Sequence, residues 1–277
     1  MSPPNTAQQA ASLTTEMHDL STGRIRRALR AARQIGLLGL VGLARQHGLR
    51  KSVGFAAQNI RHVIAHQLAQ RWDRKYGVDT AGSIQLDALT IIGPNRQFGN
   101  ESVCTSPKSF DFMMHSLPDD LARFTFVDIG AGKSRTLLLA SRYNFAKIVG
   151  VEFAKELVDC AAQNIAAFKA DWQACHDLEI VQADATQYRF PETPLVLFFY
   201  NPFCKAIFDV VLGNIVTSLK VHPRDCYVIY GSSSHNAIGW AKPAIMRTGR
   251  FEEIAAPPMP WFFDAVRGVD YAVFRSK

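Results

Sequence analysis

The sequence predicts an α/β fold, in which a mostly parallel seven-stranded sheet carries helices on both faces and follows an N-terminal helical extension. Three observations lead to this expectation. Short apolar runs alternate with helical patterns after Pro118. A glycine-rich turn joins the first of these runs directly to a helix. Finally, a chain of 277 residues has room for one α/β domain and a smaller extension.

Changes in composition divide the chain into four regions. The first is rich in Ser, Thr, Gln and Pro, which predicts disorder. The second has two stretches with apolar residues on one helical face, Arg24–Ala44 and Val53–Trp72. The third is rich in Gly, Asp, Asn and Thr, so we expect a long loop, ending in a short helix over Ser109–Leu117. The expected regions are a disordered tail (1–22), a basic helical extension (23–75), the loop with its short helix (76–118) and the α/β domain (119–277).

Seven strands are expected in the last region. They are Phe124–Ile129, Lys147–Val151, Leu178–Val181, Leu195–Tyr200, Cys226–Tyr230, Phe251–Ile254 and Tyr271–Phe274. Helical patterns cover Arg135–Tyr143, Lys155–Asp171 and Ala206–Leu219. Apolar strands joined by crossover helices are typical of a parallel sheet that is buried on both faces. No clear helix separates the last two strands, which predicts an antiparallel pair at one edge.

Composition excludes several classes of protein. Hydrophobic residues at 48% and charged residues at 20% exclude a fully disordered chain, a collagen and a small disulfide-stapled scaffold. The longest uncharged apolar run, Ile35–Ala44, is too short to span a membrane, and the polar first 22 residues do not fit a secretory signal. The five cysteines form no C-x-x-C and the histidines no H-x-x-H, so neither a metal site nor a disulfide framework is expected. These features predict a cytoplasmic protein.

The positive charge is confined to the N-terminal quarter. Residues 1–75 carry 12 Lys and Arg against 3 Asp and Glu, a balance of +9, whereas residues 76–277 carry 19 against 21, a balance of −2. Arg24, Arg26, Arg27, Arg30 and Arg33 lie opposite an apolar helical face. Such a basic helix fits an acidic macromolecule or an anionic membrane surface, which makes a peripheral membrane position a second expectation. A solvated helix that only shields the domain is the alternative.

The strongest motif follows the first expected strand. In Asp128-Ile-Gly130-Ala-Gly132, the glycines allow a tight turn and a close approach of a ligand to the N-terminus of a helix. The carboxylate of Asp128 suits a ligand that carries an ammonium group. An ordinary strand–helix turn is the alternative.

Acidic residues follow the next two strands. Glu152 ends the second strand 22 positions after Gly130, where a carboxylate can accept hydrogen bonds from both hydroxyls of a ribose. Asp184 follows the third strand and can accept a hydrogen bond from an adenine amine, although a turn aspartate explains it equally well. Together with the glycine turn, these acids indicate a nucleoside ligand.

From Phe124 onward, these motifs and the strand order resemble the class I S-adenosylmethionine-dependent methyltransferases, which have a Rossmann-like fold. The resemblance implies S-adenosylmethionine as cofactor, with Asp128, Gly130 and Gly132 at its methionine end, Glu152 at the ribose and Asp184 at the adenine. The chain departs from the family pattern at Ser134, where many members have a third glycine.

The fourth strand ends in Tyr200-Asn201-Pro202-Phe203, which resembles the Asn/Asp-Pro-Pro-Tyr/Phe motif of methyltransferases that act on nitrogen, with one proline in place of two. The oxygen of Asn201 can accept a hydrogen bond from an amine and aim its lone pair at the methyl group. Tyr200 or Phe203 can contact a cation. These three residues are the catalytic candidates, with Asn201 also beside the cofactor; a plain strand-to-turn junction is the alternative.

Residues 99–107 are similar to a segment of the histone-lysine methyltransferases that lack a SET domain, and of related bacterial protein-lysine methyltransferases. The resemblance implies that this loop folds over the cofactor, with Thr105 or Glu101 in contact, and that the acceptor is an amine, in a protein or a small molecule. A solvated loop is the alternative.

Two other classes share part of the pattern. A nicotinamide-dependent oxidoreductase has the same turn and ribose acid, but it does not need Asp128 or Asn201-Pro202. A non-catalytic cofactor-binding module would not need Asn201. His235, in a polar segment after the fifth strand, and the aromatic segment Pro257–Phe263 are weaker candidates for the substrate rim; a surface loop and core packing explain them as well.

Overall fold

The computed structural model describes residues 64–82, 89–90, 104–232, 235–260 and 269–277. The expected tail, the arginine-rich helix, Glu101 and the aromatic residues 261–263 lie outside these ranges. Residues 64–76 are helical, which agrees with part of the second expected helix of the extension.

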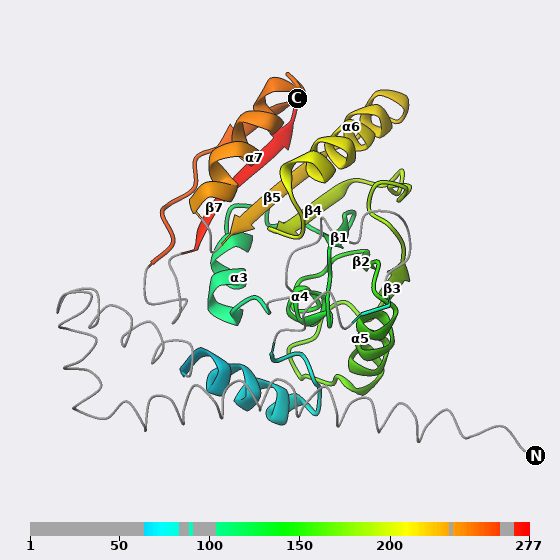
Figure 1. Ribbon diagram of the computed structural model, residues 1–277, viewed down its shortest axis with the longest axis vertical. Helices are drawn as coiled ribbons and strands as arrows, with labels where there is room; N and C mark the ends of the chain where they lie inside the picture. Colours follow the sequence, from blue (N-terminus) through cyan, green and yellow to red (C-terminus); the bar gives the residue numbers. More distant parts are fainter. Residues whose placement is uncertain (1–63, 83–88, 91–103, 233–234, 261–268) are drawn as a thin grey trace, which may run out of the picture.

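A single seven-stranded sheet forms the centre of the described structure (Figure 1). Its strands are β1 (Thr125–Ile129), β2 (Lys147–Glu152), β3 (Leu178–Gln182), β4 (Leu195–Tyr200), β5 (Cys226–Ser232), β6 (Phe251–Ile254) and β7 (Asp270–Ser276). Their order is β3-β2-β1-β4-β5-β7-β6. The first five strands are parallel, and β7 runs antiparallel to both β5 and β6. The expected sheet of seven strands with an antiparallel edge pair is therefore confirmed.

Helices cover both faces of the sheet. They are α3 (Pro107–Met114), α4 (Arg135–Ala140), α5 (Lys155–Ala167), α6 (Lys205–Val221) and α7 (His235–Arg247). The buried side chains form two large clusters, one between the sheet and α6 and α7, the other between the sheet and α3 and α4. Successive residues of a strand alternate between the two faces. Val127 and Ile129 therefore face α6 and α7, whereas Phe126 and Asp128 face α4.

The sequence analysis missed α7. The polar segment that contains His235 was a weak candidate for the substrate rim, with a surface loop as the alternative, but His235 is the first helical residue of α7. Gly239 and Pro243 explain the error, because both residues disfavour a helix interior. The helix is formed nonetheless because Ala237, Ala241, Ala244 and Ile245 are buried against the sheet.

The other four helices differ from expectation in their bounds. The helix α4 ends at Ala140 rather than Tyr143, and α6 covers Lys205–Val221 rather than Ala206–Leu219. The helix α3 begins at Pro107, two residues before the expected start, because proline fits the first helical position. The helix α5 ends at Ala167, since Phe168 adopts an extended conformation with φ −68° and ψ 128°.

No described helix is both long enough and apolar enough to cross a membrane.

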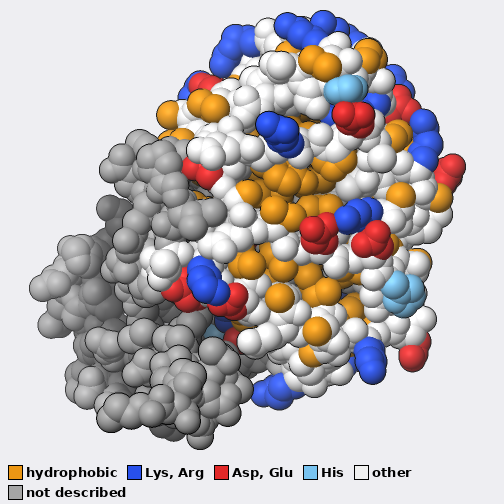
Figure 2. Space-filling view, turned by 90° about the vertical axis from the view of Figure 1, so that its right-hand side faces the viewer, with side chains coloured by type: hydrophobic (Ala, Val, Ile, Leu, Met, Phe, Trp, Pro, Cys, Tyr) orange, Lys and Arg blue, Asp and Glu red, His pale blue; other side chains and the backbone are white. Residues whose placement is uncertain are grey.

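Figure 2 shows one side of the molecule, the right-hand side of Figure 1. Hydrophobic side chains gather in the middle of this face, and acidic and basic groups lie among and around them. This mixture agrees with the nearly neutral balance of residues 76–277.

Candidate active site at the carboxyl edge of the sheet

The glycine turn lies between β1 and α4, at the carboxyl ends of the parallel strands. Gly130 and Gly132 have φ values of 83° and 54°, in the left-handed region that glycine adopts without strain. A side chain on Gly130 would also clash with Pro202, whose Cβ lies 2.5 Å from the position that a Cβ atom on Gly130 would take. The turn after β1 is thus packed against the residues that follow β4.

Ser134 is the last residue before α4. Its φ is 69°, and its hydroxyl oxygen is buried without a hydrogen-bond partner among the described residues. A glycine would fit this position without backbone strain.

Asp128 is buried beneath the glycine turn, where the hydroxyl of Thr136 donates a hydrogen bond to its carboxyl group. Burial is the main cause that raises the pKa of Asp128, to about 8, and the nearby charge of Glu152 adds to this effect. A cation bound beside Asp128 would favour the ionised carboxylate and draw off its proton. The group is therefore suited to an ammonium or sulfonium ligand.

Glu152, at the end of β2, is buried and holds the glycine turn in place. Its Oε2 accepts a hydrogen bond from the backbone N–H of Gly132 at 2.9 Å, and its Oε1 accepts from Phe153 at 2.9 Å and Ala154 at 3.0 Å. Burial raises the pKa of Glu152, and the three N–H donors oppose this shift. A carboxylate has about four acceptor positions. Three are used here, so Glu152 keeps capacity to accept from a ligand, and its contact with both ribose hydroxyls stays a prediction.

Asp184, after β3, is buried and caps the turn in which it lies. Its Oδ1 accepts hydrogen bonds from the N–H of Thr186 at 2.9 Å and from the hydroxyl of Thr186 at 2.7 Å. The amide of Asn214 in α6 holds the same turn by donating to the carbonyl of Thr186 at 2.7 Å. The turn role that the sequence analysis gave as the alternative is present, and contact with an adenine stays a prediction.

The segment after β4 contains the three catalytic candidates. Asn201 has a φ of 48°, and its Oδ1 accepts a hydrogen bond from the hydroxyl of Tyr230 in β5 at 3.3 Å. Tyr200 is half-buried and packs against Gly231. Phe203 is buried in the core, edge-on to Phe199 at a centroid distance of 6.4 Å. Its burial favours packing over contact with a substrate, which leaves Tyr200 as the aromatic candidate.

The structure therefore brings together most of the predicted site. The turn after β1 contacts Glu152 of β2 and Pro202 after β4, and all these strands end at one edge. Thr105 lies just before α3 and is buried. No group of three His, Cys, Asp or Glu side chains within the described ranges is arranged to hold a metal ion.

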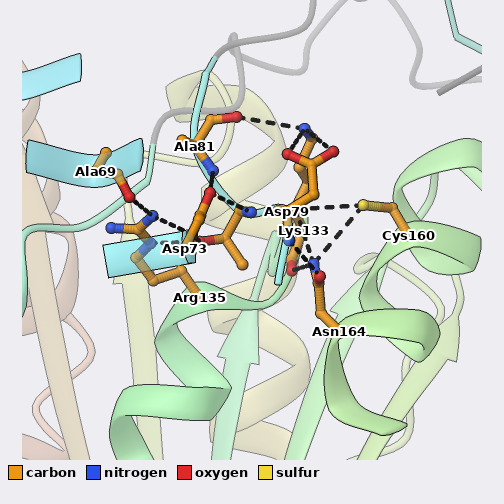
Figure 3. Close-up of polar contacts among 9 residues, drawn as sticks. Ala69, Asp73, Asp79, Ala81, Lys133, Arg135, Cys160 and Asn164 are labelled. Carbon is orange, nitrogen blue, oxygen red and sulfur yellow. Dashed lines mark hydrogen bonds and ion pairs between the residues drawn. The ribbon is translucent and has the colours of Figure 1, made fainter. Parts of the chain in front are cut away.

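Sequence analysis missed two features of this edge. One is Tyr230. It was assigned only to an apolar strand, but its hydroxyl donates a hydrogen bond to Asn201. The other is a polar network that joins residues 69–81 to the residues after the glycine turn (Figure 3). The sequence contained one signal for this network. Asn164 is a polar residue on the face of α5 that Leu157 and Ala161 bury.

Comparison with known proteins identifies the central part of the chain. Residues 127–216, which include the glycine turn, Glu152, Asp184 and Asn201, match a family model described as a methyltransferase domain. This part of the chain is an S-adenosylmethionine-dependent methyltransferase domain. No curated protein matches the chain.

Several solved methyltransferase structures are similar to this protein. A precorrin-6y C5,15-methyltransferase from Geobacter metallireducens is 16% identical over 68% of this chain and 100% of that one, with a TM-score of 0.46. A putative RNA methyltransferase from Pyrococcus horikoshii is 15% identical over 70% and 89%, with a TM-score of 0.43. An RNA methyltransferase from Salinibacter ruber, in complex with S-adenosylhomocysteine, is 16% identical over 63% and 92%, with a TM-score of 0.41.

The residues of the methyltransferase domain fit its cofactor. Gly130 and Gly132 give the turn its left-handed backbone, and the buried carboxyl of Asp128 suits a cationic methionine end. Glu152 keeps an acceptor position for a ribose hydroxyl. S-adenosylmethionine supplies an electrophilic methyl group, and the chain supplies its binding and the placement of the acceptor.

Proposed function

We propose that the protein transfers a methyl group from S-adenosylmethionine to an amine nitrogen, and that the acceptor is a lysine side chain of a protein. The observation that carries this proposal is the placement of Asn201 beside the glycine turn. Its neighbour Pro202 contacts Gly130, and the hydroxyl of Tyr230 donates to its Oδ1. This bond holds the amide of Asn201 in place, and its Oδ1 has a second acceptor position that can take an N–H of the substrate.

The reaction is a direct displacement. A lysine amine has a pKa of about 10.4 in solution and must first lose its proton to solvent. An N–H of the neutral amine then donates to the oxygen of Asn201, which aims the nitrogen lone pair at the methyl carbon. The new N–C bond forms as the C–S bond breaks, its electron pair stays on sulfur, and the product is a methylammonium cation. The ring of Tyr200 lies beside Asn201 in the chain, where it can contact the cationic product.

The cofactor roles in this proposal follow the order of the strands. We assign the methionine end to Asp128 and the glycine turn, one ribose hydroxyl to Glu152 and the adenine to Asp184. We place Thr105, which is buried before α3, in the wall of the site because the resemblance of residues 99–107 implies a loop over the cofactor. The resemblance of residues 99–107 to lysine methyltransferases that lack a SET domain supports the choice of acceptor.

Transfer of tritium from methyl-labelled S-adenosylmethionine tests the acceptor. A cell lysate is incubated with the protein and separated into protein, nucleic-acid and small-molecule fractions. We expect acid-stable label in the protein fraction, recovered as methyl-lysine after hydrolysis. Label confined to RNA or to small molecules would contradict a lysine acceptor. Label on oxygen or carbon would contradict the role of Asn201 as well.

We also propose that the arginine-rich segment 24–33, outside the described residues, recruits an acidic macromolecule or an anionic membrane to the enzyme. The charge balance of +9 in residues 1–75 supports this role. Deletion of residues 1–50 is expected to leave affinity for S-adenosylhomocysteine intact. It should raise the KM for the acceptor or abolish binding to anionic vesicles, with an effect that shrinks as salt rises. Loss of cofactor affinity on deletion would contradict a recruiting role.

A further inference from the structure

We propose that residues 73–81, which precede the methyltransferase domain, position the cofactor-binding turn and so set the affinity for the cofactor. We call these residues the strap. The strap lies outside the part of the chain that matches the family model. It contacts residues on both sides of Ser134, between the glycine turn and α4 (Figure 3).

The first contact is a buried ion pair at the start of α4. The guanidinium of Arg135 donates to Oδ1 of Asp73 at 2.7 Å and to the hydroxyl oxygen of Thr80 at 2.5 Å. Both Arg135 and Asp73 are buried, and the guanidinium also lies 4.6 Å from the ring centroid of Trp72. A buried pair is held firmly only when its remaining polar atoms are also satisfied. Here Asp73 accepts further bonds from the N–H groups of Thr80 and Ala81 at 2.8 and 2.6 Å.

The second contact holds the residue directly after the glycine turn. The ammonium of Lys133 donates to both carboxylate oxygens of Asp79, at 3.0 and 3.1 Å. The amide of Asn164 in α5 donates to the backbone carbonyls of Lys133 and Asp79, each at 2.9 Å. Its oxygen accepts from the N–H of Asp79 at 2.8 Å. Asn164 therefore ties the strap and the turn to the same point of α5.

These contacts act where the turn is strained. Ser134 has a left-handed backbone, which a non-glycine residue keeps only when the surrounding structure imposes it. The carboxylate of Glu152 fixes the turn at Gly132, and the strap fixes it at Lys133 and Arg135. Without the strap, the turn keeps its bonds to Glu152 and to Asn164, but the side chain of Lys133 loses Asp79 and that of Arg135 loses Asp73 and Thr80. Release of this strain would move the backbone N–H groups at the start of α4 away from the ligand.

The inference rests on the cofactor assignment and is independent of the acceptor. The strap residues do not need to touch the cofactor, because they act through the backbone of residues 132–135. They are positioning residues, so cofactor affinity should respond to their loss more strongly than global stability does. In kinetics, the KM for S-adenosylmethionine should rise while kcat at saturating cofactor is retained.

Calorimetric titration of the full chain with S-adenosylhomocysteine tests the strap. Thr80→Val removes the hydroxyl between Asp73 and Arg135, and Asp79→Asn weakens the pair with Lys133 at a half-exposed position where folding is not at risk. We expect each variant to raise the Kd by about 2- to 30-fold, the range for residues that act on a site indirectly. Thr80→Ser keeps the hydroxyl and should restore affinity close to that of the wild type.

Two controls separate positioning from general destabilisation. Asp159→Asn breaks an exposed ion pair with Lys155 on α5 and should leave the Kd unchanged. Ile245→Val trims the buried core of α7, far along the chain from the turn, and lowers stability without touching the strap. Equal Kd values for the wild type, Thr80→Val and Asp79→Asn would overturn the inference, as would an equal loss of affinity in Ile245→Val at the same drop in Tm. If the wild type itself did not bind S-adenosylhomocysteine, the cofactor assignment would fail, and the inference with it.

Discussion

Replacement of Glu152 by glutamine is expected to release the glycine turn from β2. In the wild type, one carboxylate oxygen accepts from Gly132 and the other accepts from Phe153 and Ala154. A glutamine can keep only one oxygen, and the rotamer that satisfies two donors leaves its NH₂ group facing the N–H of Gly132. The hydrogen bond that holds the turn is then lost.

The size of the effect follows from that one bond. A hydrogen bond to a charged group contributes about 1.5–3 kcal/mol. Since 1.4 kcal/mol is tenfold in affinity, Glu152→Gln should weaken binding of S-adenosylhomocysteine by about 10- to 100-fold if the turn must be ordered again on binding. Calorimetric titration measures this change. Glu179→Gln is the matched control, because it makes the same substitution on β3 at an exposed ion pair with Lys147 and should bind normally. A folded Glu152→Gln protein with wild-type affinity would refute both the role of Glu152 in holding the turn and its contact with the ribose.

Three further predictions concern single side chains of the site. Asn201→Ala should lower kcat by about 10²–10³-fold, as the loss of one orienting group does, with the Kd for S-adenosylhomocysteine unchanged; wild-type turnover would reduce the strand end to a plain turn. The pKa of Asp128 is raised to about 8, so the folded protein holds a proton that the unfolded chain releases near pH 4, and stability should fall as pH rises between these values. Asp128→Asn stays neutral, so its free energy of unfolding relative to the wild type should rise from pH 5 to pH 8 and then level off, as urea titrations at several pH values would show; a pH-independent difference would refute the shift. Ser134→Gly relieves a left-handed backbone and removes an unpartnered hydroxyl, so it should stabilise the protein by about 1 kcal/mol in a urea titration; a less stable variant would mean that the hydroxyl is used.

The strands were predictable because each is a short apolar run that ends in a turn signal. Leu195–Tyr200 and Phe251–Ile254 have the expected bounds, and the other strands differ by only one or two residues at an end. The helix α7 was not predictable in this way, since its helical signal is weakened by Gly239 and Pro243 and its stability comes from burial.

The candidate site was predictable as far as it depends on strand ends. Asp128, Glu152 and Asn201 were found from the ends of expected parallel strands, and parallel strands bring their carboxyl ends to one edge. The strap was not predictable, because its bonds join residues far apart in sequence. Asp79 and Asn164 are separated by 85 positions, and Asp73 and Arg135 by 62. Nothing in the local pattern of either segment specifies such a pairing.

The number of acceptor positions already used on Glu152 could not be predicted from the sequence either. Chain order placed this acid beside a ribose, but only the fold shows that three backbone N–H groups already occupy its oxygens. The same side chain shapes the turn and, in the proposed function, also contacts the ribose, so a variant at this position would change both.

A crystal structure of the full chain with bound S-adenosylhomocysteine tests the central claim most directly. We expect a ligand at the carboxyl edge of the sheet, with its amino group at Asp128, a ribose hydroxyl on Glu152 and its sulfur facing Asn201. A ligand bound elsewhere, or one whose sulfur faces away from Asn201 with the amine-orienting oxygen out of reach, would contradict it.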